Sequence, residues 1–160
     1  MEDERVSAWF ARVATTPGLG IPGRLHAPAV RVVRVGLLFD VAVIDRATGH
    51  QACSLLRAAG DLGPVVESHL GRCSFLVEPG HGAGWNELVA QAEPGAVAAR
   101  FVSTGAYLWI PTACPPRPGE QPAAWWVQAP RTVGAGVALT DPARLCAALG
   151  LAAHFPTAAG

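Results

Sequence analysis

The chain has 160 residues with 12 basic and 12 acidic side chains, so its formal net charge at pH 7 is zero. Because 51% of its residues are hydrophobic, and a chain of this length can bury roughly 70% of its unfolded surface, a disordered chain is excluded. The balanced charge disfavours a broad basic surface for nucleic acid but permits a local basic patch. The chain contains no lysine, which excludes a P-loop lysine, a Schiff-base lysine and a Ser-Lys dyad.

Apolar periodicity, β-branched runs and breaker residues predict the elements of the chain. The first half of the chain begins with a helix at 2–13 and a Pro/Gly loop at 16–23, followed by a hairpin or two sequential strands at 30–35 and 38–44. A helix at 50–59, ended by Gly60, precedes a hairpin of strands 64–68 and 73–77 and a short helix at 85–91. The second half has strands at 97–102 and 107–110, with Pro111 closing the second, then a proline-rich loop at 115–119 and a strand at 125–127. The last element is a helix with Asp141 as N-cap and Pro142 at its first position, ended by Gly150. This mixed order predicts an α+β fold, with a mixed or antiparallel sheet, hairpins and about four helices. We expect one domain over residues 1–150 and a frayed tail at residues 151–160.

The cysteines are scattered and form no C-x-x-C pair; they are Cys53, Cys73, Cys114 and Cys146. His69 lies four residues before Cys73, but no further pair completes a tetrahedral set, so the spacing disfavours a structural zinc. The acidic residues 2–4 are unlike the basic start of a signal peptide, and no apolar run approaches about eighteen residues. We therefore expect a cytoplasmic protein with reduced thiols and no membrane partner.

Two carboxylates lie in the apolar strand segment at residues 39–45. A buried carboxylate must be paired, so Asp40 is either a metal ligand or a strand-end aspartate bonded to an arginine or to the backbone. Asp40 and Asp45 are five residues apart and would point to opposite faces of one strand, so they cannot share a metal ion. The residue two positions after each is Ala42 or Ala47, so neither face of the strand carries a pair of acids for two metals.

Other polar and aromatic features have ordinary structural interpretations beside the functional ones. The glycine-rich segment 79–85 could hold a phosphate on its backbone N–H groups, but its spacing matches no nucleotide-binding motif and a tight turn is commoner. The Trp125–Trp126 pair, and Tyr107 with Trp109, could stack on bases, although one of each pair usually faces the core. No Ser-His-Asp or Cys-His arrangement can be read from the sequence.

Three segments, in order and between about residues 38 and 127, together resemble one protein family. They are Leu38–Asp45 followed by Gly49 and His50, then Gly71–Pro79, and then Gly105–Thr112 with Gly119, Trp125 and Trp126 downstream. The first is similar to a strand bearing a D-x-D metal pair, and the second to a Gly-rich turn and strand with a nucleotide-binding histidine. The third is similar to a G-G-Y-x-x-x-P-P-S…G…Y-x-W signature. The family with these motifs is the bifunctional DNA primase/polymerase N-terminal (Prim-Pol) domain of the archaeo-eukaryotic primase superfamily.

The resemblance implies an RRM-like palm whose carboxylate-held Mg²⁺ or Mn²⁺ ions activate the attacking hydroxyl. In an active member Asp40 would hold metal, with Asp45 as a further catalytic acid. The chain departs from the family in three ways: alanine replaces the second aspartate of D-x-D, Cys73 stands in place of the histidine, and residues 98–102 carry no third carboxylate. These departures imply a degenerate, stand-alone Prim-Pol-like domain without the helicase portion and with no certain cofactor.

The leading hypothesis is a non-catalytic Prim-Pol-like domain that binds a nucleotide or nucleic acid, or that has become a regulatory interaction module. The residues expected to bind nucleotide or phosphate are His69, Gly71, Arg72, Cys73, Arg100 and Tyr107. Among them Arg72 and Arg100 offer guanidinium groups, whose planar forks suit phosphate geometry.

Two alternatives remain open. The first is an active primase/polymerase with relocated metal ligands such as Asp45, Glu67 or Glu78. The second is a ligand-free adaptor whose proline-rich loop and tryptophans, within residues 115–126, bind a protein partner. The partners considered are thus a nucleotide, single-stranded DNA or another protein.

Overall fold

The computed structural model of the chain describes residues 2–14, 30–81, 84, 85, 87, 99–111 and 122–150. Its elements are α1 (Glu2–Ala11), β1 (Val30–Arg34), β2 (Asp40–Asp45), α2 (Arg46–Ala59), β3 (Val65–Ser68), β4 (Arg72–Val77), β5 (Ala99–Val102), β6 (Tyr107–Pro111), β7 (Ala124–Gln128), β8 (Thr132–Val133), β9 (Gly136–Val137) and α4 (Pro142–Ala148). The fold class is α+β, as the residue patterns predict, and its sheets are mostly antiparallel. Among the described residues of the predicted helix at 85–91, Trp85 and Glu87 have helical backbone.

The main sheet has five strands in the order β5-β2-β4-β3-β7, and each neighbouring pair is antiparallel. Because β2 and β3 both pair with β4, they run parallel to each other, and α2 connects them. In the same way β4 and β5 run parallel on either side of β2. Two strands that flank a third and are joined by a helix form the split β-α-β motif of ferredoxin-like sheets.

The first two predicted strands do not form a hairpin. Strand β1 pairs instead with β6 in a separate two-stranded sheet, whereas β2 lies inside the main sheet. The second open interpretation, two sequential strands, is therefore the correct one. The chain between them, from Val35 to Phe39, turns at Gly36, whose φ of 92° is in the left-handed region that favours glycine.

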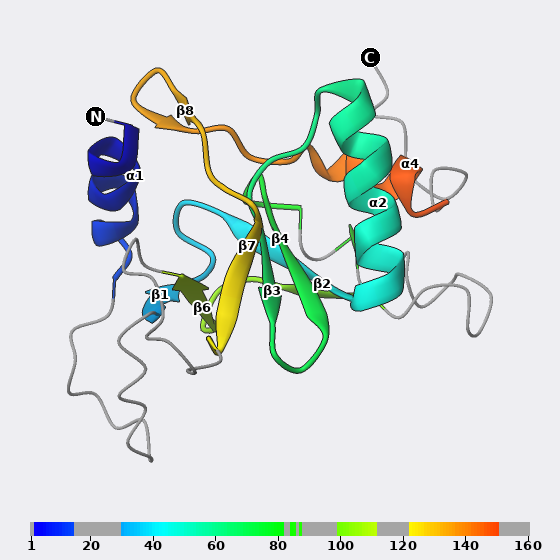
Figure 1. Ribbon diagram of the computed structural model, residues 1–160, viewed down its shortest axis with the longest axis horizontal. Coiled ribbons are helices and arrows are strands. Elements are labelled where there is room, and N and C mark those ends of the chain that lie inside the picture. Colours follow the sequence, from blue (N-terminus) through cyan, green and yellow to red (C-terminus); the bar gives the residue numbers. More distant parts are fainter. Residues whose placement is uncertain are drawn as a thin grey trace.

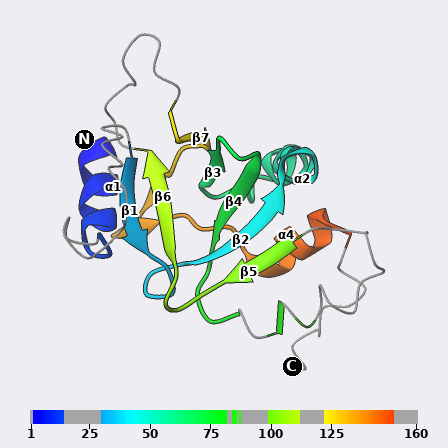
Figure 2. The same ribbon diagram turned by 90° about the horizontal axis from the view of Figure 1, so that it is seen from below.

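Side chains of the main sheet alternate between two apolar cores, one on each face. The core beneath α2 and α4 receives Ala42 and Ile44 from β2. The core beneath α1 and the β1–β6 sheet receives Val41 from β2, together with Trp9 and Phe10 from α1. Figures 1 and 2 show the main sheet between these two sets of elements. Both faces are thus covered, which explains why β2 is apolar at nearly every position.

Helix α2 begins four residues before its predicted start at His50, because Asp45 is its N-cap. The Asp45 carboxylate accepts a hydrogen bond from the Thr48 N–H at 3.0 Å. The predicted end is confirmed, since Gly60 has a φ of 78° and its N–H bonds the carbonyls of the last turn. In α4, the predicted Asp141 N-cap is confirmed, with Pro142 at the start of the helix.

The hairpin predicted at residues 64–77 is confirmed as β3 and β4, with Glu67 opposite Cys73 in the register. The strands predicted near 97–102, 107–110 and 125–127 are confirmed as β5, β6 and β7. The predicted loops at 16–23 and 115–119 lie outside the described residues, as does the predicted tail.

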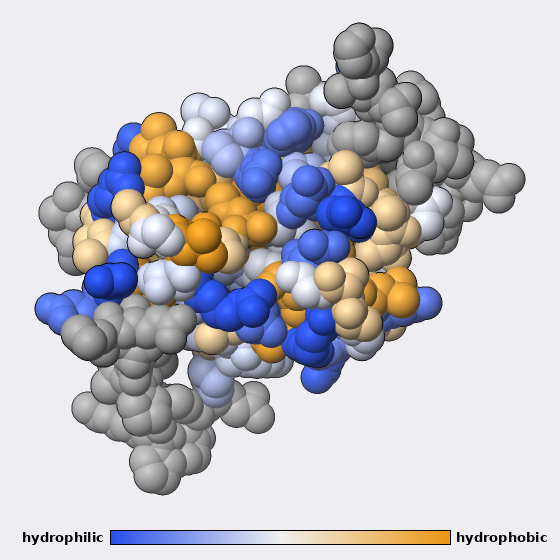
Figure 3. Space-filling view, turned by 90° about the horizontal axis from the view of Figure 1, so that it is seen from above, coloured by the Kyte–Doolittle hydropathy of each residue, from blue (hydrophilic) through white to orange (hydrophobic). Residues whose placement is uncertain are grey.

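None of the helices in the described ranges is long and apolar enough to cross a membrane. The exposed large apolar side chains are Leu37, Leu55, Leu70, Tyr107 and Val133. Figure 3 shows several separate groups of hydrophobic residues on the face seen from above Figure 1, with hydrophilic residues between them. Polar and apolar side chains are therefore interspersed on this face.

Candidate functional site

Asp40, where the resemblance implies a metal ligand, is buried at the start of β2 with 1% of its surface exposed. One carboxylate oxygen accepts a hydrogen bond from the Gly80 N–H at 2.8 Å, and the other accepts one from the Ser103 hydroxyl at 3.0 Å. These partners follow β4 and β5, the two strands that flank β2. Asp40 therefore ties three strand ends together, as a strand-end aspartate bonded to backbone and hydroxyl.

Asp45 lies at the other end of β2 and caps α2. Hydrogen bonds from Thr48 lower the pKa of the Asp45 carboxyl below its ordinary value of 3.8. Five residues of strand separate the Cα atoms of Asp40 and Asp45 by roughly 16 Å, and their side chains leave opposite faces. The structure does not bring the two predicted catalytic acids together.

Most of the predicted phosphate-binding residues are spread along one end of the main sheet. His69 and Gly71 lie in the β3–β4 turn, where the His69 Nδ1 is 3.2 Å from the Ala123 carbonyl oxygen and Gly71 has a φ of 70°. Tyr107 is 56% exposed but belongs to the separate β1–β6 sheet. These three residues do not converge with one another on one pocket.

Arg72 and Arg100 share one face of the main sheet. Arg72 is opposite Asp45 in the β2–β4 register, and Arg100 is opposite Val43 in the β2–β5 register. Directly paired residues point to the same face, and Val43 and Asp45 also share a face. The two arginines therefore flank β2 on the face away from α2, with their Cα atoms roughly 12 Å apart. Both side chains are exposed.

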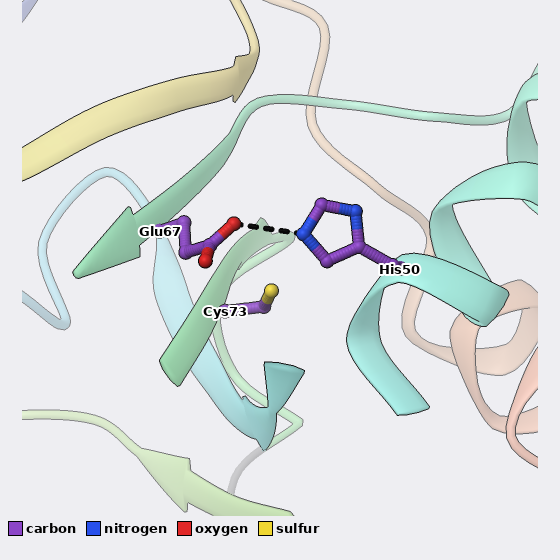
Figure 4. Close-up of side chains that lie close together, drawn as sticks. All are labelled: His50, Glu67 and Cys73. Atoms are coloured by element: carbon purple, nitrogen blue, oxygen red, sulfur yellow. Dashed lines mark hydrogen bonds and ion pairs between the residues drawn. The ribbon is translucent and has the colours of Figure 1, made fainter. Parts of the chain in front are cut away.

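Cys73 points to the opposite face, where the structure brings it together with His50 and Glu67 (Figure 4). His50 comes from α2, Glu67 from β3 and Cys73 from β4. The His50 Nε2 lies 2.7 Å from one Glu67 carboxylate oxygen, and the imidazole, the carboxylate and the thiol all have a ligand atom within 4.8 Å of one another. Figure 4 shows the thiol directed toward the His50–Glu67 pair. We call these three residues the His–Glu–Cys cluster.

Two features of the sequence build this cluster. The hairpin register places Glu67 beside Cys73 on one face, at adjacent strands. Gly49 then allows α2 to lie directly on β4, since a Cβ at this position would come within 2.6 Å of the Cys73 Cβ. The next residue of α2, His50, is thereby held over Glu67.

The cluster is buried on the sheet side and open on the helix side. The Glu67 side chain is 1% exposed, whereas the His50 side chain is 47% exposed. The Arg46 Nε lies 2.9 Å from the second Glu67 oxygen, Oε1, but its N–H is not directed at that atom, so Oε1 accepts no hydrogen bond. Burial, and next the Glu67 charge, raise the pKa of the Cys73 thiol to about 12. The thiol is therefore protonated and is not a reactive nucleophile as it stands.

Spacing along the sequence does not reveal this cluster, because its members come from three elements. Glu67 is 17 residues from His50, and neither forms a local ligand pair. One signal was present: the predicted hairpin places Glu67 and Cys73 opposite each other if its turn spans the residues between Ser68 and Arg72. The approach of His50 depends on the packing of α2 on the sheet.

No protein-family model matches this chain, and neither a curated protein nor a solved structure does so. The fold and the side chains described above define an α+β protein with a split β-α-β sheet, an arginine pair on one sheet face and a His–Glu–Cys cluster on the other.

Proposed function

We propose that this chain is a Prim-Pol-like domain that has lost polymerase chemistry and binds the phosphates of a nucleotide or of single-stranded nucleic acid. The strand order β5-β2-β4-β3 supports the RRM-like palm that the resemblance implies. The first strand of this four-stranded unit begins with Asp40, which the resemblance aligns with the first family acid. The expected cytoplasmic location is part of the same proposal.

The loss of polymerase chemistry is supported by what surrounds Asp40. Nucleotidyl transfer by two metals requires carboxylates that hold ions about 3.5–4 Å apart. Both Asp40 oxygens already accept hydrogen bonds, and the next residue on the same face of β2 is Ala42. Within the part of the chain that the structure describes, Asp40 belongs to no group of three metal-ligating side chains.

The relocated-ligand alternative requires acids near Asp40, and two of its three candidates lie elsewhere. Asp45 caps α2 at the far end of β2, and Glu67 is paired with His50 and Arg46 on the α2 side of the sheet. We therefore favour the non-catalytic reading.

The observation that carries phosphate binding is the placement of Arg72 and Arg100 on one face, on either side of β2. Guanidinium groups donate paired hydrogen bonds to phosphate oxygens, and neither group can lose its proton near neutral pH. Asp45 offsets part of the charge of Arg72, because the two are cross-strand neighbours. Arg100 consequently supplies the stronger attraction for an anion.

The test is fluorescence anisotropy of a labelled single-stranded oligonucleotide at low salt, with a deoxynucleoside triphosphate as competitor. We expect the double variant Arg72→Ala/Arg100→Ala to bind at least about tenfold more weakly, and the slope of log affinity against log salt to fall by about 1.4 for two lost contacts. The matched control is Arg57→Ala, an exposed arginine on α2, which should bind as the wild type does. Equal binding by the double variant and the wild type, or no binding of either ligand, overturns the proposal.

The adaptor alternative depends on residues 115–126, of which the structure describes 122–126. Trp126 packs on Phe10 with ring centroids 6.0 Å apart, so it contributes to the core beneath α1. Trp125 is half-buried on the other face of β7. Self-association that is lost in Trp125→Ala, together with absent phosphate binding, would favour the adaptor.

A further inference from the structure

The His–Glu–Cys cluster presents three different metal-ligating groups from three elements. An imidazole nitrogen, a carboxylate oxygen and a thiol sulfur are the ligand types that zinc and its neighbours in the first transition series take in proteins. They converge from α2, β3 and β4, so their positions are fixed by the packing of the fold and not by a local loop. The phosphate-binding proposal leaves all three groups unused.

An independent observation points to a ligand at this place. The Glu67 side chain is 99% buried, since only 1% is exposed, yet its Oε1 accepts no hydrogen bond. A buried carboxylate oxygen without a hydrogen bond is costly. Oε1 is paired with the Arg46 guanidinium, whose side chain is 65% exposed, and a carboxylate oxygen with one such partner still has a lone pair for a second cation.

We propose that His50, Glu67 and Cys73 form a binding site for a divalent transition-metal ion, with zinc as the preferred ion. Bond lengths of about 2.0–2.3 Å to nitrogen, oxygen and sulfur place tetrahedral ligand atoms about 3.5 Å apart. The ligand atoms of the cluster lie 2.7 Å apart for His50 and Glu67 and within 4.8 Å for the whole set. Rotamer adjustments of less than about 1.5 Å therefore reach the required geometry.

The chemistry of binding balances without a further reactant. The metal ion replaces the thiol proton of Cys73, which leaves to solvent as the sulfur forms its bond to the metal. It also replaces the hydrogen bond that the His50 Nε2–H donates to Glu67. The Nε2 proton moves through solvent to Nδ1 of the same ring, so that Nε2 and a carboxylate oxygen can each donate a lone pair to the ion. Three protein ligands leave a fourth position, which water can occupy from the exposed side of His50.

The test is a titration of the chelator-treated full chain with Co²⁺, which reports thiolate ligation by a near-ultraviolet charge-transfer band and tetrahedral geometry by its visible bands. We expect one Co²⁺ per chain, and displacement of these bands by Zn²⁺. Cys73→Ser should abolish the charge-transfer band, and His50→Gln should weaken Co²⁺ binding at least about tenfold. Because the His50 side chain is half exposed, His50→Gln should fold, and it tests metal binding even if Cys73→Ser fails to fold.

Matched controls separate this site from adventitious binding. Cys146→Ser removes another buried thiol, and His81→Gln removes another exposed imidazole, and both should leave the cobalt spectrum unchanged. The absence of cobalt bands in the wild type at concentrations that detect a Kd of about 100 μM overturns the proposal. A charge-transfer band that persists in Cys73→Ser, or an affinity unchanged in His50→Gln, overturns it as well. None of these readouts depends on phosphate binding, so the two proposals fail separately.

Discussion

Two aspartates of the same strand show how position decides the role of a carboxylate. Asp40 is buried and accepts hydrogen bonds from two segments distant in sequence, whereas Asp45 bonds the first turn of the following helix. Both were candidate catalytic acids on the strength of the resemblance. Their surroundings give each one a structural role that needs no metal.

Removal of the Asp45 cap should destabilise the protein. Asp45→Ala leaves the Thr48 N–H without its acceptor, and loss of such a cap costs about 1 kcal/mol of unfolding free energy. Asp45→Asn keeps an acceptor oxygen and should cost less. Urea unfolding at pH 7 measures both, and equal stability of Asp45→Ala and the wild type would contradict the assigned cap.

The same cap predicts a pH dependence. Because the folded pKa of Asp45 lies below its ordinary value of 3.8, its contribution is fully present above that value and is lost as the pH falls through the folded pKa. The stability difference between the wild type and Asp45→Ala should therefore stay constant from pH 7 to about pH 5 and shrink below about pH 4. A difference that grows on acidification would contradict the assignment.

At the scale of elements, the sequence predicts those helix ends and turns that depend only on residues close together in the chain. The Gly60 and Asp141 helix ends and the β3–β4 hairpin follow from cap and turn chemistry, and all of them are confirmed. The pairing of β1 with β6 was not predictable, because it joins strands more than 70 residues apart. The start of α2 differs from the prediction because Asp45 both ends β2 and caps α2, so that no loop separates the strand from the helix. The approach of His50 to Glu67 was missed because it depends on helix-to-sheet packing.

Asp40 fixes the ends of three strands, and its removal should be more costly than that of a surface cap. Asp40→Ala leaves the Gly80 N–H and the Ser103 hydroxyl without their acceptor, at a cost of about 3 kcal/mol. Asp40→Asn should cost less, because its amide oxygen can accept from Gly80 while its amide nitrogen donates to the Ser103 hydroxyl oxygen. Urea unfolding distinguishes the two variants, and a stable Asp40→Ala protein would contradict this role.

At the scale of the whole molecule, the main sheet separates two sets of polar groups. The arginine pair lies on the face away from α2, and the His–Glu–Cys cluster lies between the sheet and α2. The chain has no net charge, so attraction of an anion must come from the local arrangement of Arg72 and Arg100.

The central claim is that the main sheet holds no polymerase metal centre around Asp40. Calorimetric titration with a deoxynucleoside triphosphate, with and without Mn²⁺, tests it most directly at concentrations that detect a Kd of about 100 μM. We predict binding whose affinity does not require Mn²⁺ and is unchanged in Asp40→Asn. Binding that requires Mn²⁺ and disappears in Asp40→Asn would show that Asp40 holds a catalytic metal and would contradict the claim.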